Sequence, residues 1–563
     1  MDISLKEKVP GRIYWVFIAL ICLIRGVLII PNLDDGINFL HLYNTMGWEH
    51  PFYNDYFGQP FHFNRPLILL YALLYTLAGN PAFRLIALVH AAELFACICL
   101  FYACVRRYAS EEASQAGALL FLYFLFVQPY LSPTRPETTV LLCALAVFWL
   151  CVRFSDTRRV GWLCIASALL FLVGLPMHTN GSIPFIYLAL FIVTERRTLS
   201  FRPALTLAAC SLFCALAGAA ILLYPHISSF AQSLALFSYD GTRFSMLKGE
   251  YIRMRQFVSG YHNFPLILCL VFFSAGLLLA GRRSFRLTDL KQYRNILLFL
   301  LAVVLGLGVL PSATWEVYSV YYFLPLIAAG AVAIDRHARR SPHHYGVRFL
   351  LAAVGLVTLW LGYGTRPPLY LLLYAGPFFL AAILIRKMRA ERIVALIVLP
   401  MFLFSTVEMI SSKIIYDRAG QRIRAAAGVV IANPLFSFSG ESVLQAGTYD
   451  MRRERGVTTI ELIPVVRTKA DLINAHPLVK FFGPPPPLRK ESRWASRREL
   501  GREFLLITNN EWGFVGYIEE RVRPLGYAAV EDVSLSDRLL DSYANPSLKG
   551  LRCMEFRRTF SPP

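Results

Sequence analysis

The sequence predicts a mostly α-helical protein that crosses a membrane many times and ends in a small α/β domain. Of its 563 residues, 56% are hydrophobic and only 16% are charged, whereas soluble domains carry about 25% charged residues. Apolar runs long enough to span a bilayer as helices recur from Ile13 to Ile410. From Ser411 onward the composition becomes polar, and short strand-like runs such as "VTTIELIPVV", "EFLLITNN" and "LRCMEFRR" follow.

The apolar runs predict about thirteen transmembrane helices. The first run is long and ends without a small-residue cleavage site, so we expect a membrane span and not a removable signal peptide. Residues 65–79 are too few to cross a bilayer, which predicts an outer juxtamembrane helix lying at the interface. The expected spans are 13–31, 83–104, 113–131, 137–153, 161–175, 181–195, 204–223, 264–281, 295–310, 318–334, 347–363, 368–386 and 392–410.

Basic clusters between the spans predict the orientation. With the N-terminus in the cytoplasm, dense clusters such as Arg106–Arg107, Arg158–Arg159 and Arg282–Arg283 all fall in cytoplasmic loops, as the positive-inside rule requires. The cytoplasmic loops therefore account for the net charge of +20, and we expect no nucleic-acid partner. These patterns predict a multi-pass protein of the cell inner membrane.

The chain divides into two expected domains. Residues 1–410 form the transmembrane domain, with long outer loops at 32–82 and 225–262. Residues 411–563 form a periplasmic or extracellular α/β domain, because an odd number of spans places the C-terminus outside. Ten of the eleven cysteines lie in or beside apolar runs, and their spacing predicts neither a disulfide framework nor a zinc site of cysteines.

Two adjacent carboxylates, Asp34 and Asp35, follow the first span within the stretch "PNLDDGINF". Like charges side by side repel each other, and one of the pair would titrate at a raised pKa. A divalent cation or the hydroxyl of a substrate would relieve the repulsion. The alternative is structural, since Asp35 could cap a following helix.

The second and third outer loops add further polar groups. "SPTRPETT" brings Arg135 and Glu137, and "GLPMHTNGSIPF" brings His178 and Asn180 between two apolar runs. Irregular backbone at membrane depth is tolerated where it lines a cavity walled by protein. The alternatives are that Glu137 complements a helix dipole and that "TNG" is a simple turn.

The fourth outer loop is basic, contrary to the general pattern. A phosphate-bearing ligand would explain positive charge on the outer side, and a solvated amphipathic segment would explain it equally well. Two tyrosines in "YSVYYFLPL" stand at the outer start of a span, where aromatic belts are common. The candidate substrate- and phosphate-binding residues of these two segments are Arg243, Lys248, Arg253, Arg255, Tyr321 and Tyr322.

The order of these features resembles the GT-C glycosyltransferases, particularly the branch of the protein O-mannosyltransferases and the lipid A aminoarabinose transferase. The resemblance rests on the acidic pair behind the first span, on "RPLILLYALLYTLAGNPAFRLIAL" and on "YYFLPLIAAGAVAI". Glu137 matches an acidic residue of the second outer loop of that branch. Asp35 stands where the family usually has Glu, and His178 stands where a Lys is common.

The resemblance implies transfer of a sugar from a polyprenyl-phosphate donor to a glycan, lipid or protein acceptor, with inversion. Asp34 would be the general base, and Asp35 and Glu137 would bind the acceptor. His178 and the basic loop would hold the departing phosphate. Asp34, Asp35, Glu137 and His178 could also hold a divalent Mg, Mn, Ca or Zn ion. No glycine-rich phosphate cradle is present, so no nucleotide cofactor is expected.

Three alternatives stay open. A transporter or flippase of a lipid-linked substrate would suit charged residues within apolar runs. An enzyme similar to the O-antigen ligases would use a diphosphate lipid donor, and a membrane scaffold would bind a partner through the polar C-terminal region.

Overall fold

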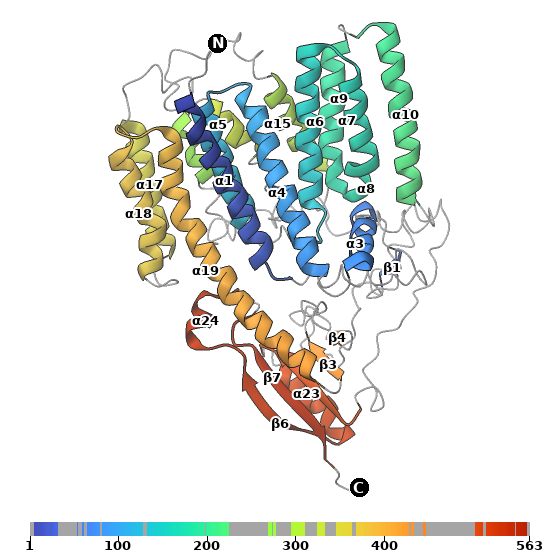
Figure 1. Ribbon diagram of the computed structural model, residues 1–563, viewed down its shortest axis with the longest axis vertical. Coiled ribbons are helices and arrows are strands. Elements are labelled where there is room, and N and C mark those ends of the chain that lie inside the picture. Colours follow the sequence, from blue (N-terminus) through green and yellow to red (C-terminus); the bar gives the residue numbers. More distant parts are fainter. Residues whose placement is uncertain are drawn as a thin grey trace.

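The structure is a computed structural model in which the chain forms a helical bundle joined to a small sheet (Figure 1). Every one of the thirteen expected spans contains helical residues. The fold class that the sequence predicts, mostly helical with a small C-terminal α/β part, is therefore confirmed. The described residues are 5–31, 53–54, 59–60, 65–78, 82–127, 132–196, 199–223, 268–272, 274–276, 294–309, 324–332, 345–362, 368–426, 429–432, 443–445, 501–509, 514–545 and 548–559.

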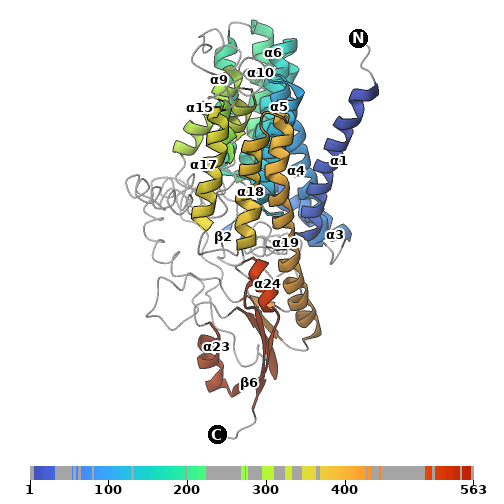
Figure 2. The same ribbon diagram turned by 90° about the vertical axis from the view of Figure 1, so that its left-hand side faces the viewer.

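The helices of the bundle run along a common axis (Figures 1 and 2). Many of their large apolar side chains are exposed, as expected for helices that face lipid. Within the described residues, five helices are long and apolar enough to cross a membrane. The chain is thus a multi-pass membrane protein. The principal helices are α1 (Leu5–Leu28), α4 (Ala82–Arg106), α5 (Glu111–Val127), α6 (Glu137–Thr157), α9 (Ser182–Glu195), α10 (Phe201–Leu223), α15 (Arg294–Val309), α17 (Tyr345–Gly362), α18 (Pro368–Leu384) and α19 (Ala390–Ala425).

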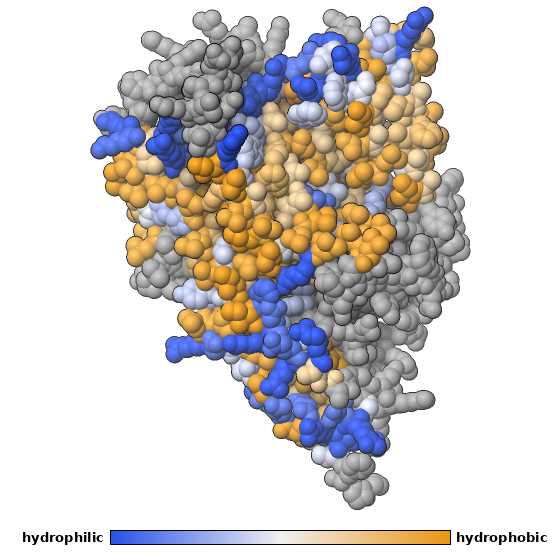
Figure 3. Space-filling view, in the orientation of Figure 1, coloured by the Kyte–Doolittle hydropathy of each residue, from blue (hydrophilic) through white to orange (hydrophobic). Residues whose placement is uncertain are grey.

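The two ends of the bundle differ in composition. One end, here named the basic end, carries the arginines at helix termini: Arg106, Arg107, Arg158, Arg294 and Arg389. The other end faces the C-terminal sheet and is named the sheet end. An apolar belt separates hydrophilic regions at the two ends (Figure 3).

The segment between α6 and α9 departs from a regular helix. The predicted span 161–175 is built from α7 (Gly161–Leu169), a π-helical turn (Leu170–Gly174) and α8 (Leu175–Met177), and a 3-10 turn (Thr179–Gly181) leads into α9. The wide π turn brings its backbone against α10, where a Cβ on Gly218 would lie only 2.0 Å from the carbonyl oxygen of Phe171. Such turns are frequent at functional sites, and this one ends beside His178.

Helix α19 is longer than the predicted span 392–410. It continues past the expected domain boundary to Ala425 because its last turns have an apolar stripe that packs on the sheet. Ile415, Tyr416 and Ala419 are buried there together with sheet residues. Within the bundle, Phe402 anchors the same helix through edge-to-face contacts with Tyr123 and Phe126 at 5.6 and 5.1 Å between ring centroids.

The C-terminal sheet has five strands in the order β4-β3-β5-β7-β6. β3 pairs in parallel with β4 and β5, whereas β7 pairs antiparallel with β5 and β6. The end of α19 covers one face, and α23 (Phe514–Val522) covers the other. The strands are β3 (Val429–Ala432), β4 (Val443–Gln445), β5 (Glu503–Thr508), β6 (Tyr527–Ser534) and β7 (Arg552–Arg558).

Two of the three predicted strand runs, "EFLLITNN" and "LRCMEFRR", form β5 and β7. The third, "VTTIELIPVV", lies outside the described residues. The division of the chain into domains 1–410 and 411–563 stays a prediction.

Candidate functional site

The loop before α6 holds a buried ion pair at the sheet end. Arg135 Nε donates to Glu137 Oε1 and Oε2 at 3.0 and 3.1 Å, and its Nη2 donates to Oε1 at 2.5 Å. The Glu137 side chain is 1% exposed and that of Arg135 is 13% exposed. Charge-assisted, forked contacts of this kind are strong and orient the guanidinium. The loop before α6 therefore holds a fixed ion pair and not a solvated carboxylate.

The turn between α8 and α9 places His178 next to this pair. His178 has an extended backbone, and its Nδ1 accepts a hydrogen bond from the backbone N–H of Asn180 at 3.2 Å. Because Nδ1 is an acceptor, the neutral ring carries its proton on Nε2. Gly181 is required in this turn, since a Cβ there would lie 2.3 Å from the carbonyl oxygen of Gly174.

Burial and neighbouring charges set the protonation state of His178. Burial lowers the pKa of this imidazole below its ordinary value of 6.5, the Glu137 carboxylate opposes that shift, and the Arg135 guanidinium adds to it. The interaction with both partners of the ion pair shows that the three side chains share one environment. His178 is thus held neutral, as a hydrogen-bond donor through Nε2.

Asn180 lies beside His178 and has a side-chain amide without a hydrogen-bond partner among the described residues. Its side chain is fully buried, and within the described part of the chain neither the amide oxygen nor the amide nitrogen has a hydrogen-bond partner. Leaving such a group unpaired costs about 1–3 kcal/mol, so an orphaned buried amide calls for a ligand or an ordered water. The structure therefore brings together four of the predicted residues, Arg135, Glu137, His178 and Asn180.

The four residues lie at the level of the middle of α4, away from the end of that helix that faces the sheet. The Thr139 hydroxyl donates to Glu93 Oε1 at 2.8 Å, and Cys97 Sγ lies 3.9 Å from the carbonyl oxygen of Thr138. Glu93 is about 16 Å along the axis from Ala82 at 1.5 Å per residue. The start of α6 is thus recessed to the middle of α4, which places the site inside the bundle.

Helix α3 (Arg65–Ala78) packs near α4 and α8, on the side of α8 that faces the sheet end (Figure 1). The Tyr71 hydroxyl is buried and donates to the carbonyl oxygen of Pro133 at 2.6 Å, which fixes the loop before Arg135. Leu70, Leu73 and Leu77 point outward and are 42–76% exposed. An apolar helix with exposed leucines is typical of the membrane interface, as the short run 65–79 predicts.

Sequence reasoning missed the partners that support the site. Tyr71 belongs to an apolar run and gives no signal of its own beyond being a hydroxyl in a buried stripe. Glu93 lies in an apolar span, and the structure pairs it with Thr139 and, at 3.8 Å, with Nδ1 of His90. The hydrogen bond from Thr139 links α4 to the first turn of α6.

The other predicted site residues lie outside the described residues: Asp34, Asp35, Arg243, Lys248, Arg253, Arg255, Tyr321 and Tyr322. Of the predicted metal ligands, only Glu137 and His178 are described. No group of three His, Cys, Asp or Glu side chains that could hold a metal ion occurs in the described part of the chain.

Three solved structures share the fold. ArnT from Cupriavidus metallidurans bound to undecaprenyl phosphate matches with a TM-score of 0.57 and 14% identity, over 99% of this chain and 100% of that one. The same protein in the apo state matches with 0.54 and 13%, over 97% and 98% of the two chains. The arabinosyltransferase EmbB from Mycobacterium smegmatis matches with 0.50 and 16%, over 78% of this chain and 43% of that one.

These proteins are GT-C glycosyltransferases, so the GT-C fold that the sequence predicts is confirmed. No protein-family profile matches the chain, and no curated protein matches its sequence.

Proposed function

We propose that this chain is an integral membrane glycosyltransferase. It moves a sugar from a polyprenyl-phosphate donor to a glycan, lipid or protein acceptor on the outer face of the membrane, with inversion at the anomeric carbon.

The proposal rests on the group of buried polar side chains at the sheet end, which consists of Arg135, Glu137, His178 and Asn180. A guanidinium held by a buried carboxylate, a neutral imidazole with its donor on Nε2, and an unsatisfied amide offer several hydrogen-bond donors to one ligand. Phosphate oxygens are acceptors and suit such a set. The fold is that of ArnT, which has been solved with undecaprenyl phosphate.

We infer the orientation of the chain in the membrane from the arginines at the basic end. The basic end faces the cytoplasm by the positive-inside rule, which puts the N-terminus inside and the candidate site and the C-terminal sheet outside. The cell inner membrane is the proposed location. A C-terminal alkaline phosphatase fusion should be active, and an inactive fusion of a stably expressed chain would contradict this orientation.

The proposed reaction is a direct displacement. The oxygen of the acceptor hydroxyl bonds to the anomeric carbon of the donor, and the bond from that carbon to the phosphate oxygen breaks with its electron pair going to the phosphate. Asp34 takes the proton of the hydroxyl. Arg135, positioned by Glu137, and the donor N–H of His178 bind the departing phosphate and stabilise its charge.

The remaining predicted residues complete the proposed site. Asn180 and Asp35 bind hydroxyl groups of the acceptor or the sugar. The basic segment with Arg243, Lys248, Arg253 and Arg255 closes over the phosphate, and Tyr321 and Tyr322 contact the sugar at the interface.

A divalent ion would be held mainly by the acidic pair. The Glu137 oxygens already accept from Arg135, and Nδ1 of His178 already accepts from a backbone N–H. Asp34 and Asp35 would therefore supply the charge that a Mg, Mn, Ca or Zn ion needs. Chelation of the purified protein followed by addition of single metals tests this, and unchanged turnover after chelation would remove the ion from the proposal.

The decisive experiment is transfer by the purified chain in lipid nanodiscs from radiolabelled polyprenyl-phosphate sugars. Asp34→Asn should lower turnover by at least about 100-fold, since general bases contribute about 10²–10⁴-fold. Asp156→Asn is the matched control, because Asp156 pairs with Arg107 at the basic end. A folded Asp34→Asn variant with normal turnover would refute the role of Asp34.

The same purified preparation distinguishes two alternative functions from the proposed one. An enzyme that prefers polyprenyl-diphosphate donors would belong to the ligase-like class. A flippase would move a fluorescent lipid-linked sugar across a vesicle without forming a new glycoside, and the His90–Glu93 contact within the bundle is the feature that favours it.

A further inference from the structure

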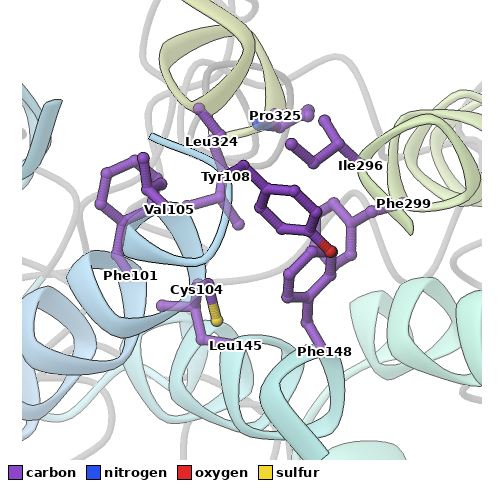
Figure 4. Close-up of a pocket in the computed structure, with 11 residues that line it drawn as sticks. Phe101, Cys104, Val105, Tyr108, Leu145, Phe148, Ile296, Phe299, Leu324 and Pro325 are labelled. Carbon is purple, nitrogen blue, oxygen red and sulfur yellow. The ribbon is translucent and has the colours of Figure 1, made fainter. Parts of the chain in front are cut away.

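Helix α6 exposes one narrow stripe between Thr139 and Arg153. On another face of this helix, Leu145 and Phe148 point into a small apolar space that they share with Tyr108 (Figure 4). The residues of α6 that are not fully buried recur every three or four positions, as one face of a helix requires. They are Thr139, Leu142, Ala146, Trp149 and Arg153. Trp149 and Arg153 therefore lie on the outer stripe of the helix, toward its basic end.

Two tryptophans hold the guanidinium of Arg153. Its Cζ lies 5.5 Å from the ring centroid of Trp149 and 5.9 Å from that of Trp162, near the start of α7. The two indoles meet edge-to-face at 6.0 Å between centroids. The Nε1–H of Trp162 donates to Thr157 Oγ1 at 3.0 Å. The rings are therefore fixed in place, and their faces stabilise the cation that lies over them.

These side chains lie at the depth of a membrane interface. Arg153 is about 6 Å along the helix axis from Thr157, the last residue of α6, at 1.5 Å per residue. The polar layer on each side of the hydrocarbon core of a bilayer is about 5–8 Å thick, and tryptophan is enriched there. Ile165, one turn past Trp162, is 48% exposed, as expected of a residue that contacts lipid chains.

Arg153 has no carboxylate partner among the described residues. Asp156, on the next turn of α6, pairs with Arg107 instead. Glu195 of α9 pairs with Arg158. A charge at a lipid-facing surface is costly unless it finds a partner, so Arg153 calls for an anion that the membrane supplies.

The surroundings favour an anionic lipid over a zwitterionic one. The ammonium group of phosphatidylcholine binds best over an aromatic ring, but the Arg153 guanidinium already lies over both indoles. Arg158 and Arg159, between α6 and α7, add positive charge that repels an ammonium group. A phosphate that carries no ammonium suits a guanidinium, which can donate two parallel hydrogen bonds to it.

We propose that Arg153, held between Trp149 and Trp162, binds the phosphate of an anionic phospholipid from the membrane leaflet at the basic end. The acyl chains of this lipid lie on the outer surface of α6 and α7, past Ile165. The site is separate from sugar transfer and does not rest on the proposed function.

The test is lipid retention by the full chain, purified in detergent after exposure to vesicles of three parts phosphatidylcholine and one part radiolabelled phosphatidylglycerol. We expect the wild type to retain phosphatidylglycerol in a larger share than the vesicles contain. Arg153→Gln should lower the affinity for phosphatidylglycerol at least about tenfold. Arg202→Gln is the matched control and should bind as the wild type does, since Arg202 is exposed in the first turn of α10 without an aromatic or acidic partner among the described residues.

Two further variants test the tryptophans and the forked shape of the guanidinium apart from its charge. Arg153→Lys keeps the charge but loses the paired donors, and Trp162→Leu releases the guanidinium, so both should lower the affinity severalfold. They also cover the case in which Arg153→Gln does not fold.

Three results would overturn the proposal. The first is an unchanged affinity for phosphatidylglycerol in the folded variants of Arg153 and Trp162. The second is an equal loss in Arg202→Gln, because the overall charge of the basic end would then attract the lipid. The third is displacement of the lipid by inorganic phosphate, which would make this a site for a soluble anion.

Discussion

The two ends of the bundle hold their buried carboxylates in different ways. At the basic end, Glu195 accepts from Arg158 Nη1 at 2.6 Å and also pairs with Arg294. These arginines belong to the end of α6 and the start of α15, so one carboxylate of α9 ties three helices together. At the sheet end, Glu137 is held by Arg135, which is only two residues away in the same loop.

This difference bears on whether each buried charge has a structural role or the role in ligand binding that we propose. Desolvating an ion pair is costly, and a buried pair is weak evidence for stability. The pair of Arg158 and Arg294 with Glu195 has an evident structural role, since it joins separate helices. The pair at the sheet end lies within one loop and the first turn of α6, beside the buried amide of Asn180. Under the proposed function, its burial orients Arg135 toward a ligand.

Removing the two carboxylates should give different phenotypes, and this is the largest expected effect. Glu137→Gln leaves the Arg135 cation without its anion and should cost about 3 kcal/mol of stability, at the low end for broken buried pairs. Turnover should fall by at least about 100-fold, as when a charge-stabilising group is lost. Glu195→Gln should also lower stability while the folded protein keeps its turnover. Thermal unfolding in detergent and sugar transfer measure both quantities.

The comparison would fail if Glu137→Gln lost stability and kept full turnover, because the sheet-end pair would then be structural as well. Glu112→Gln serves as the baseline. Glu112 pairs with Arg389 at the surface of the basic end, with both side chains about half exposed or more, and such pairs contribute about 0–1 kcal/mol.

A substitution at Asn180 should lower turnover without lowering stability. Asn180→Ala removes two buried polar atoms that have no partner within the described part of the chain. We expect unchanged or slightly higher stability, because deleting an unpaired polar group removes its desolvation cost, and about tenfold lower turnover. The control is Ser167→Ala, which leaves the Ser211 hydroxyl without the bond seen at 3.0 Å. That variant should lose about 1 kcal/mol and keep its turnover. Lower stability in Asn180→Ala with normal turnover would make Asn180 a packing residue.

Much of the bundle follows from the sequence because hydrophobic length alone determines where a membrane helix can form. The short run 65–79 predicts α3 for the same reason. The continuation of α19 to Ala425 was not predictable from hydropathy, since the polar residues Asp417 and Arg418 separate Ile415 and Tyr416 from Ala419, and their apolar stripe becomes evident only against the sheet. The π turn at Leu170–Gly174 likewise depends on the approach of Gly218.

The sequence predicts four described residues of the candidate site, but not the depth at which they lie. Loop position identifies Arg135, Glu137, His178 and Asn180, because polar groups at helix ends stand out in an apolar chain. Their depth in the bundle depends on where the start of α6 lies along the axis of α4. Contacts such as the hydrogen bond from Thr139 to Glu93 fix that position. Spacing along the chain carries no information about that position. The pairing of Arg135 with Glu137, in place of a metal-binding carboxylate, also needed the three-dimensional structure.

The smallest expected effect is a pH dependence that arises from His178 at the sheet end. The pKa of His178 is lowered in the folded chain, chiefly by burial, whereas the unfolded chain has the ordinary value of about 6.5. Between these two pKa values the unfolded state binds more protons, so stability falls as pH drops below about 6.5, by at most about 1.4 kcal/mol per pH unit. Above that value the contribution is constant. His178→Gln should remove this slope from melting curves recorded between about pH 5 and pH 7.5, while Glu195→Gln should retain it. Equal slopes in the wild type and His178→Gln would mean that the imidazole is not held neutral by the fold, and the sheet end would then lose its proposed uncharged donor to the phosphate.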